Sequence, residues 1–463
     1  MSLQNFPDLT FHPARPRPLD DAEREPLRIV IVGAGLSGLA AAIALAREGH
    51  KVIVFEKQKR SQHANDFTGI VLSPNAIRIL QEWRLLEKVR NISHGIVAHD
   101  VRRYDNLGEK IASIDLQARK EDQHWFTLRT EFLQLLRAKA RDRGVRFYEG
   151  VEVLHIGTGD EVDYGRPSVS LSNGETIEAD FLIGADGAGS TVRKTLFPTH
   201  KSKAVGQMMW STVVPSSALE DPELKHLKEN YQAGHDVLTP GPGKGVLVFP
   251  LPKRDLLAVQ IMVQQTPVEQ DSKQLDGWVT DLSNLKARFQ DADPAISKIL
   301  STVKQAYKWQ AISAAKLTSW SSSKGRVVLL GDACHSTTPL GNLSSTLCLE
   351  DAATLASLLS TATPDQNLRH RITLYENLRI PRTDRIRDFA QHQIENWTFN
   401  DPEQIRVRNE LWNKTAQSWW RDLHQIAEPE MMAGFGSPEF QAWLNRYDVF
   451  EEARKAKMRA ARL

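Results

Sequence analysis

The sequence contains little cysteine. Of its 463 residues only two are cysteines, Cys334 and Cys348. Neither lies in a C-x-x-C motif or at the spacing of zinc ligands, which argues against a disulfide framework and against a structural zinc site. This usage is typical of a protein from a reducing compartment.

An excess of charge of either sign is also absent. Lys and Arg number 59 against 57 Asp and Glu, which gives a formal net charge of +2. Such a balance gives no reason to expect a nucleic acid or an anionic membrane as partner. Hydrophobic residues make up 41% and charged residues 25%, ordinary values for a globular chain long enough for two or three domains. The oligomeric state stays open.

No signal peptide and no transmembrane segment are predicted. The first residues lack an apolar core, and the apolar stretch from Leu27 to Glu56 is interrupted by glycines and flanked by charge. We therefore expect a cytoplasmic or peroxisomal protein. The peroxisomal alternative rests on Ala461, Arg462 and Leu463, a conservative variant of the Ser-Lys-Leu address, although a frayed helix end would read the same way.

The chain is organised around that stretch, whose glycines have the G-x-G-x-x-G spacing. A β-branched strand leads into Gly33, Gly35 and Gly38, an Ala/Leu-rich helix follows, and a second strand ends at Glu56. Gly33 permits the turn, Gly35 lets backbone approach a pyrophosphate, and Gly38 lets helix and strand pack closely. Glu56 is placed to accept hydrogen bonds from a ribose. The motif alone leaves FAD and NAD(P) open.

Two later segments have the same form. An apolar strand runs into Gly184-Ala-Asp186-Gly187, and another runs into Gly331-Asp332. In doubly wound sheets the ligand binds outside the carboxyl ends of the strands. Three such ends therefore predict one extended ligand that crosses several strand termini.

These motifs resemble those of the group A, FAD-dependent aromatic-ring monooxygenases of the para-hydroxybenzoate and salicylate hydroxylase type. The resemblance runs over residues 28–390, and YDVFEEA near the end is similar to fungal members. It is carried by GAGLSG with Glu56, GADGAGSTVR, GDACH with Pro339, Glu350-Asp351-Ala, and Tyr375 with Arg379 and Arg382.

The resemblance implies an α/β fold, with a Rossmann-like (GR2-type) FAD domain, a β-sheet substrate domain and a C-terminal helical region. The boundaries we predict are a flexible N-terminal arm at 1–27, the FAD domain at 28–198 and 318–390 with some substrate-domain strands near 96–114, the substrate domain at 199–317, and the helical region at 391–463.

The resemblance also implies the cofactor site. Gly33, Gly35 and Gly38 would face the FAD pyrophosphate, Glu56 the ribose, and Arg129 the phosphates, although an ion pair is the alternative for Arg129. Asp186 and Gly187 would serve FAD and a passing NAD(P)H, and Asp332 the ribityl chain; helix caps are the alternative for the two aspartates. Gly69 and Ser345 would lie near the flavin ring, and His335 would be structural. NAD(P)H would dock transiently, since the sequence has no second G-x-G-x-x-G.

The sequence departs from the family near the flavin ring. Leu340 to Thr346 replaces a Gly-Gln-Gly loop after Pro339, and Phe67-Thr68-Gly69 replaces Gly-Ala-Gly. Trp210-Ser211 replaces an aromatic-Arg pair, and Phe249-Pro250 replaces Tyr-Pro. Loss of that Arg and Tyr argues against an anionic phenol as substrate. Trp210, Phe249 and Pro339 are our candidate pocket residues, for an apolar aromatic or polycyclic substrate, unless the two rings belong to a core.

Three functions follow as alternatives. The first is an FAD monooxygenase that uses NAD(P)H and O₂ to hydroxylate or epoxidise an apolar secondary metabolite. The second is an FAD-bound cyclase or isomerase that does no redox chemistry, which would explain altered residues around the ring beside an intact ADP site. The third is a silent homologue that acts as a binding protein. No catalytic residue is assigned.

Overall fold

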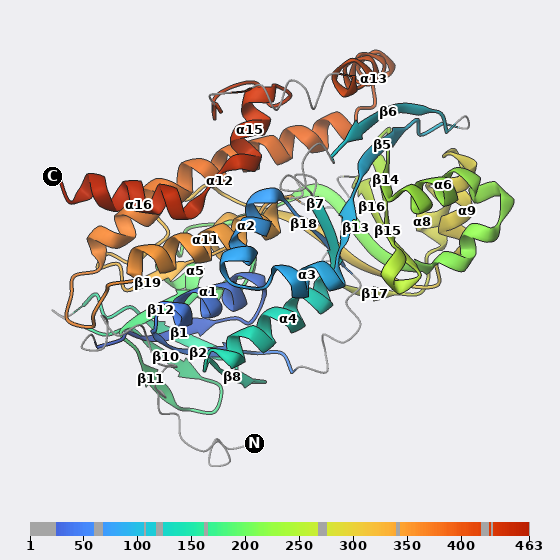
Figure 1. Cartoon of the computed structure of the whole chain (residues 1–463). Coiled ribbons are helices and arrows are strands. Elements are labelled where there is room, and N and C mark those ends of the chain that lie inside the picture. The colour runs from blue at the N-terminus through green and yellow to red at the C-terminus, as the bar shows by residue number, and fades with distance from the viewer. Residues whose placement is uncertain are drawn as a thin grey trace.

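The computed structural model describes residues 25–59, 68–105, 108–116, 124–161, 165–266, 276–338, 343–417, 426 and 429–462. Figure 1 shows two sheets side by side, with long helices laid across them. Pro339 to Asn342, Phe67, Leu463 and most of the expected N-terminal arm lie outside the described residues.

The first sheet has five parallel strands in the order β19-β12-β1-β2-β8. Its strands are short, and β1, β2, β12 and β19 are apolar and largely buried, as expected for a parallel sheet covered on both faces. Helix α1 packs between α4 and α11 on this sheet. The bounds are β1 Arg28–Val32, α1 Leu36–Arg47, β2 Lys51–Glu56, α4 Arg129–Asp142, β8 Arg146–Glu149, β12 Phe181–Gly184, β19 Val327–Leu329 and α11 Ser344–Leu359.

The second sheet has eight strands in the order β17-β18-β13-β16-β15-β14-β5-β6. It combines strands from two distant parts of the chain, because β5 pairs in parallel with β14. The bounds are β5 Ala98–Arg102, β6 Lys110–Asp115, β13 Ser202–Pro215, β14 His235–Gly241, β15 Lys244–Leu251, β16 Leu256–Gln264, β17 Gly277–Val279 and β18 Ala306–Ala314.

The two faces of this second sheet have separate cores. One face packs under α6 (Lys225–Ala233), α8 (Ser283–Ala287) and α9 (Pro294–Thr302). The other faces the small sheet β3-β7-β4, made of Gly69–Leu72, His124–Leu128 and His94–Ile96, and the end of helix α12. Because successive side chains along a strand point to opposite faces of the sheet, a residue's position in its strand decides which of the two cores it joins.

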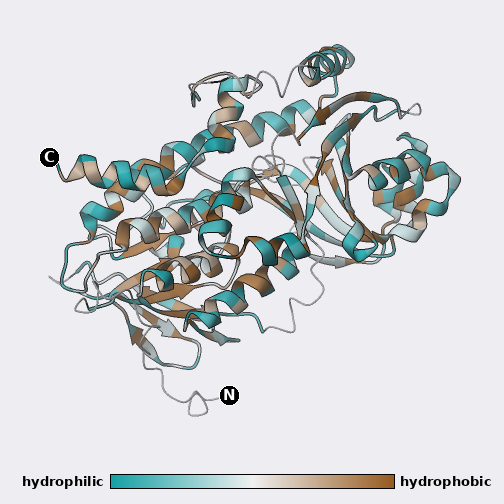
Figure 2. Cartoon of the chain, in the orientation of Figure 1, coloured by the Kyte–Doolittle hydropathy of each residue, from teal (hydrophilic) through white to brown (hydrophobic). Residues whose placement is uncertain are grey.

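The last part of the described chain is helical. Helices α12 (Arg369–Trp397), α13 (Pro402–Ala416), α15 (Pro438–Arg446) and α16 (Val449–Ala460) lie over the sheets. Figure 2 shows brown, hydrophobic residues concentrated in the sheet strands, while teal dominates these outer helices. Within the described residues no helix is both long enough and apolar enough to cross a bilayer. The fold class that the sequence predicts is confirmed.

One predicted element is different. The apolar spacing from Ala76 to Val89 predicts a single helix, but the chain forms α2 (Pro74–Glu82) and α3 (Leu86–Ile92). Between them Arg84 adopts a φ of 57°, and Trp83 is almost fully buried. The apolar residues of α2 and α3 keep their helical spacing across the turn at Arg84, so this spacing alone does not reveal the turn.

Candidate functional site

The three glycine-rich corners meet at one edge of the five-stranded sheet. The backbone N–H of Ala185 donates to the Val32 carbonyl at 2.8 Å, and that of Leu330 donates to the Gly184 carbonyl at 2.9 Å. A Cβ on Gly33, whose φ is 102°, would lie 2.4 Å from the Ala185 oxygen. The corners after β1, β12 and β19 are therefore in contact, and a side chain at Gly33 would force the first two apart.

Two cavities run along this edge and join. The first, of about 680 Å³, lies over the ends of β1, β2 and β12; the second, of about 390 Å³, lies beside β3, β18 and the start of α11. Both are lined by Gly35, Arg129, Ala185 and Gly187. The result is one elongated site, as the sequence predicts for a long ligand.

Gly35 lines both cavities, and its surroundings fit a bound dinucleotide. It precedes α1 with φ −71° and ψ −171°, extended backbone that any residue can adopt. A Cβ added to it would meet no atom within 4 Å, so it would project into open space that the bare backbone leaves for a ligand. The unpaired N–H groups of the first turn of α1 adjoin the same space and favour an anion. These features fit the pyrophosphate of FAD.

Gly38 has the packing role that its position in the motif predicts. A Cβ on Gly38 would lie 1.9 Å from the Gly33 carbonyl oxygen, so only glycine allows α1 to approach the turn this closely. Gly35 and Gly38 thus have different roles, because Gly35 leaves space for a ligand and Gly38 avoids a clash between α1 and the turn at Gly33.

Glu56 lies at the end of β2 and lines the larger cavity. Its carboxylate accepts the backbone N–H of Ala34 and that of Gln58, both at 2.8 Å. Because a carboxylate has about four acceptor positions, two remain for ribose hydroxyls. Arg129 begins α4 and lines both cavities at their junction.

The two aspartates have different surroundings. Asp186 accepts the Ser190 hydroxyl at 2.5 Å and the backbone N–H groups of Thr191 and Val192, at 2.6 and 3.2 Å, so it caps α5 (Thr191–Leu196). This capping role is the alternative that the sequence analysis noted for Asp186, although the residue still lines the larger cavity. Asp332 begins α10 (Asp332–His335) and is exposed to the smaller cavity. Desolvation by the surrounding protein raises the pKa of its carboxyl, although the charges of His335 and Arg129 oppose this shift.

The expected flavin-ring positions line the smaller cavity. Ser345 lies in the first turn of α11 and donates its hydroxyl to the Val71 carbonyl at 2.7 Å instead of capping the helix. Gly69 is glycine for a reason other than the ligand, because a Cβ there would lie 1.9 Å from the Phe126 ring. Gln260 of β16, which sequence reasoning missed, also lines this cavity and donates to the Gly69 carbonyl at 3.2 Å.

Trp210 and Phe249, the predicted pocket aromatics, both pack in cores. Trp210 points to the α6, α8 and α9 side of the second sheet, the face away from the small sheet. Phe249 points to the other face but is 1% exposed and stacks on Phe126 at 4.2 Å between ring centroids. The structure therefore places them as packing residues, the alternative noted from sequence. The third candidate, Pro339, lies outside the described residues.

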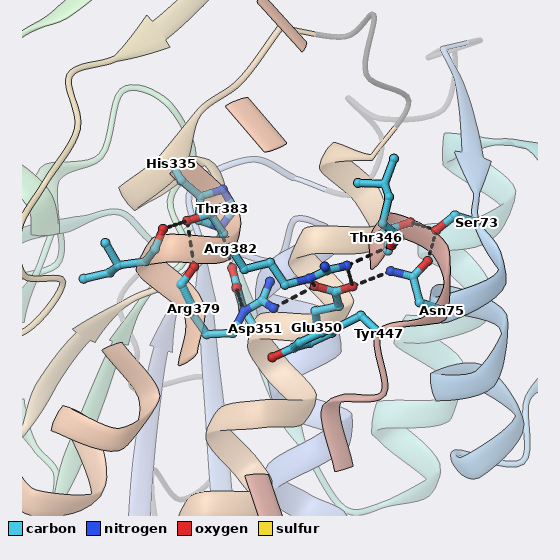
Figure 3. A network of polar contacts seen from close by, with 12 residues as sticks. Ser73, Asn75, His335, Thr346, Glu350, Asp351, Arg379, Arg382, Thr383 and Tyr447 are labelled. Carbon is cyan, nitrogen blue, oxygen red and sulfur yellow. Dashed lines mark hydrogen bonds and ion pairs between the residues drawn. The ribbon is translucent and has the colours of Figure 1, made fainter. Parts of the chain in front are cut away.

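A buried ionic network supports the α11 end of the site (Figure 3). Glu350 and Asp351 are fully buried on α11. Glu350 accepts Arg379 Nη1 at 2.7 Å and Arg382 Nε at 2.8 Å, both from α12, and also Asn75 Nδ2. Burial alone would raise the pKa of the Glu350 carboxyl, but the two arginines outweigh it and the net pKa is lowered.

Asp351 extends this network to the third glycine corner. Its carboxylate accepts Arg379 Nε at 2.8 Å, contacts His335 Nε2 at 2.5 Å and accepts the Gly331 N–H at 3.1 Å. Despite burial, His335 and Arg379 lower its pKa to about 2. His335 thus holds the loop that carries Asp332.

Comparison with known proteins gives consistent results. The model of a family described as FAD binding domain matches residues 27–390. FAD-dependent monooxygenase OpS4 of Beauveria bassiana is 28% identical over 446 residues, covering 94% of this chain and 98% of that protein.

Solved structures share the fold. CtdE in complex with FAD and its substrate 4 superposes with a TM-score of 0.76 at 20% identity, over 94% of this chain and 99% of that one. A salicylate hydroxylase substrate complex gives 0.71 at 21% identity, over 93% and 98%.

Proposed function

Because the chain belongs to the FAD binding domain family, we propose that it is a monooxygenase that holds FAD along the joined cavities and oxygenates an apolar aromatic or polycyclic substrate. The observation that carries the proposal is the continuous site across the ends of β1, β12 and β19. The family match and the monooxygenase relatives favour redox chemistry, and nothing in them favours the cyclase or isomerase alternative.

The chain's own residues divide the cofactor between the cavities. The pyrophosphate belongs at Gly33, Gly35 and the start of α1, with Glu56 on the ribose and Arg129 on the phosphates. Gly187 borders both halves, and Asp332, Gly69 and Ser345 belong to the flavin half. With this assignment, 28–198 and 318–390 form the FAD-binding unit, apart from β5 and β6, which join 199–317 in the substrate unit.

Bound FAD would supply the redox chemistry, in which electrons from NAD(P)H would serve to activate O₂ for transfer of one oxygen atom to the substrate. The protein orients the reactants and screens the reaction from water. The N-terminus of α11, with Ser344 and Ser345 on the flavin-side cavity, places the positive end of a helix dipole where negative charge would develop. The ionic network behind Glu350 and Asp351 fixes that helix end.

The function has a direct test. Purified protein is expected to be yellow, to release FAD on denaturation, and to oxidise NADH or NADPH faster when a polycyclic aromatic substrate is added. Flavin absorbance and the loss of NAD(P)H absorbance at 340 nm measure the two properties. A yellow protein that converts substrate without consuming NAD(P)H would establish the cyclase alternative instead, and a colourless, inert protein would establish the binding-protein alternative.

We also propose a peroxisomal address at the end of the chain. Ala461 and Arg462, which follow α16, are exposed, as a receptor would require. A fluorescent protein carrying the last ten residues is expected to collect in peroxisomes, and the same fusion with Arg462→Glu is expected to stay diffuse. A wild-type fusion that stays diffuse would contradict the proposal.

A further inference from the structure

A third cavity, of about 430 Å³, lies between the second sheet and the C-terminal helices. It shares Val71 with the flavin-side cavity, and Leu343, next to Ser344, lines it as well. The two spaces therefore adjoin at the start of α11. The walls are largely apolar and aromatic, with Val101, Ile114, Leu238, Phe389, Trp397 and Trp412 among them. This size and lining suit a polycyclic aromatic molecule.

His99 and Asp236 form a hydrogen-bonded pair at this cavity. They are register partners on the adjacent strands β5 and β14, with Nδ1 of His99 2.7 and 2.8 Å from the two carboxylate oxygens. The Asp236 side chain is 1% exposed, whereas that of His99 is 20% exposed and lines the cavity. Within the described residues no hydrogen bond reaches His99 Nε2. A carboxylate on Nδ1 fixes the tautomer in which Nε2 carries a lone pair.

The surrounding charges allow an anion to form beside His99. His124 of β7 also lines the cavity, and burial lowers its pKa to about 3, so it is neutral. His392 of α12 and Arg446 of α15 line it too, and the described lining contains no carboxylate. The pKa of Asp236 is raised above its usual value, because burial and the neighbouring Asp100 outweigh the opposing effects of His99 and His235.

The polar groups at this cavity include His124 and Asn445, whose side chains interact with each other. The cavity thus combines an apolar body with a small polar end, as a specific ligand site does.

We propose that His99 is the general base of the reaction and that its substrate is a polycyclic phenol bound in the third cavity. Nε2 takes the phenolic proton: the O–H bond breaks, an N–H bond forms, and the electron pair stays on the substrate, where it enriches the ring for attack on oxygen. The proton later returns to product or water. Asp236 is a positioning residue that holds the imidazole. This inference rests on the proposed monooxygenase function and revises the expectation against an anionic phenol.

The test uses 7-hydroxycoumarin, whose neutral and anionic forms absorb at different wavelengths, with the FAD-loaded protein. Binding to the wild type is expected to produce the anion at a pH where the free probe is neutral. His99→Asn is expected to lower the anion-to-neutral ratio of bound probe by roughly tenfold or more. Asp236→Asn is expected to lower this ratio without loss of probe affinity, because an amide permits the other imidazole tautomer. His155→Asn, which changes an exposed histidine of β9 (Val153–Gly157) outside this cavity, is the control and should keep the anion band.

Failure of the His99 proposal can be told apart from failure of the proposed monooxygenase function. The flavin content of the wild type and its oxidation of NAD(P)H test the monooxygenase function separately. If the wild type oxidises NAD(P)H but does not bind the probe, the phenol site is wrong. If the probe binds as anion equally well to His99→Asn, or if His155→Asn loses the band as fully, the role of His99 is wrong.

Discussion

Replacing Glu350 with alanine is expected to lower the free energy of unfolding by about 3–5 kcal/mol, because it leaves two buried guanidinium groups without their shared carboxylate. Arg379 is 0% and Arg382 2% exposed, so water cannot take the place of Glu350. Arg382 keeps the Leu444 carbonyl at 3.0 Å and the Tyr447 ring at 3.9 Å, which limits the loss but leaves its charge uncompensated. Urea titration followed by tryptophan fluorescence measures the change.

The control is an exposed ion pair of the same kind. Glu403 pairs with Arg406 on α13, with both side chains more than half exposed, so Glu403→Ala should leave the unfolding midpoint unchanged. Glu350→Gln should lie between Glu350→Ala and the wild type, since it keeps the shape but not the charge. A loss for Glu350→Ala no larger than for Glu403→Ala would show that the network contributes little to stability.

Gly35→Val is expected to weaken FAD binding by roughly a hundredfold, about 2.7 kcal/mol, while the apoprotein unfolds at the same temperature as wild type. The backbone at Gly35 is extended and an added Cβ meets no atom within 4 Å, so we expect the apoprotein to accommodate the valine without strain. It instead occupies the space where the pyrophosphate approaches the start of α1. Flavin fluorescence titration of the apoprotein measures the dissociation constant.

Two comparisons make this result specific. Gly277→Val is the matched control, because Gly277 also has open space and no positive φ but lies on β17, outside the joined cavities. Gly38→Ala should lower the unfolding temperature of the apoprotein as well, since its Cβ would lie 1.9 Å from a backbone oxygen. Normal FAD affinity in Gly35→Val would place the pyrophosphate elsewhere and remove the basis of the site.

The amino-acid sequence by itself determined the features that are local or that repeat. The spacing of Gly33, Gly35 and Gly38 specifies a turn, a phosphate contact and a close packing within a few residues, and the continuous apolar runs of β1 and β12 are typical of strands in a covered parallel sheet. Since parallel strands in one sheet end at the same edge, three glycine corners were enough to predict an elongated site. The family resemblance, the fold class and the FAD cofactor are confirmed by the family match and the solved relatives.

The tertiary structure decided which partner each polar or aromatic side chain meets. Asp186 became a helix cap because α5 starts immediately beside it, and Trp210 joined a core because strand parity turns it to the helix-covered face. His99 and Asp236 are 137 residues apart, and only the parallel pairing of β5 with β14 brings them together. Pairing between distant strands is set by the packing of the whole chain, which leaves no periodicity in either segment for sequence analysis to read.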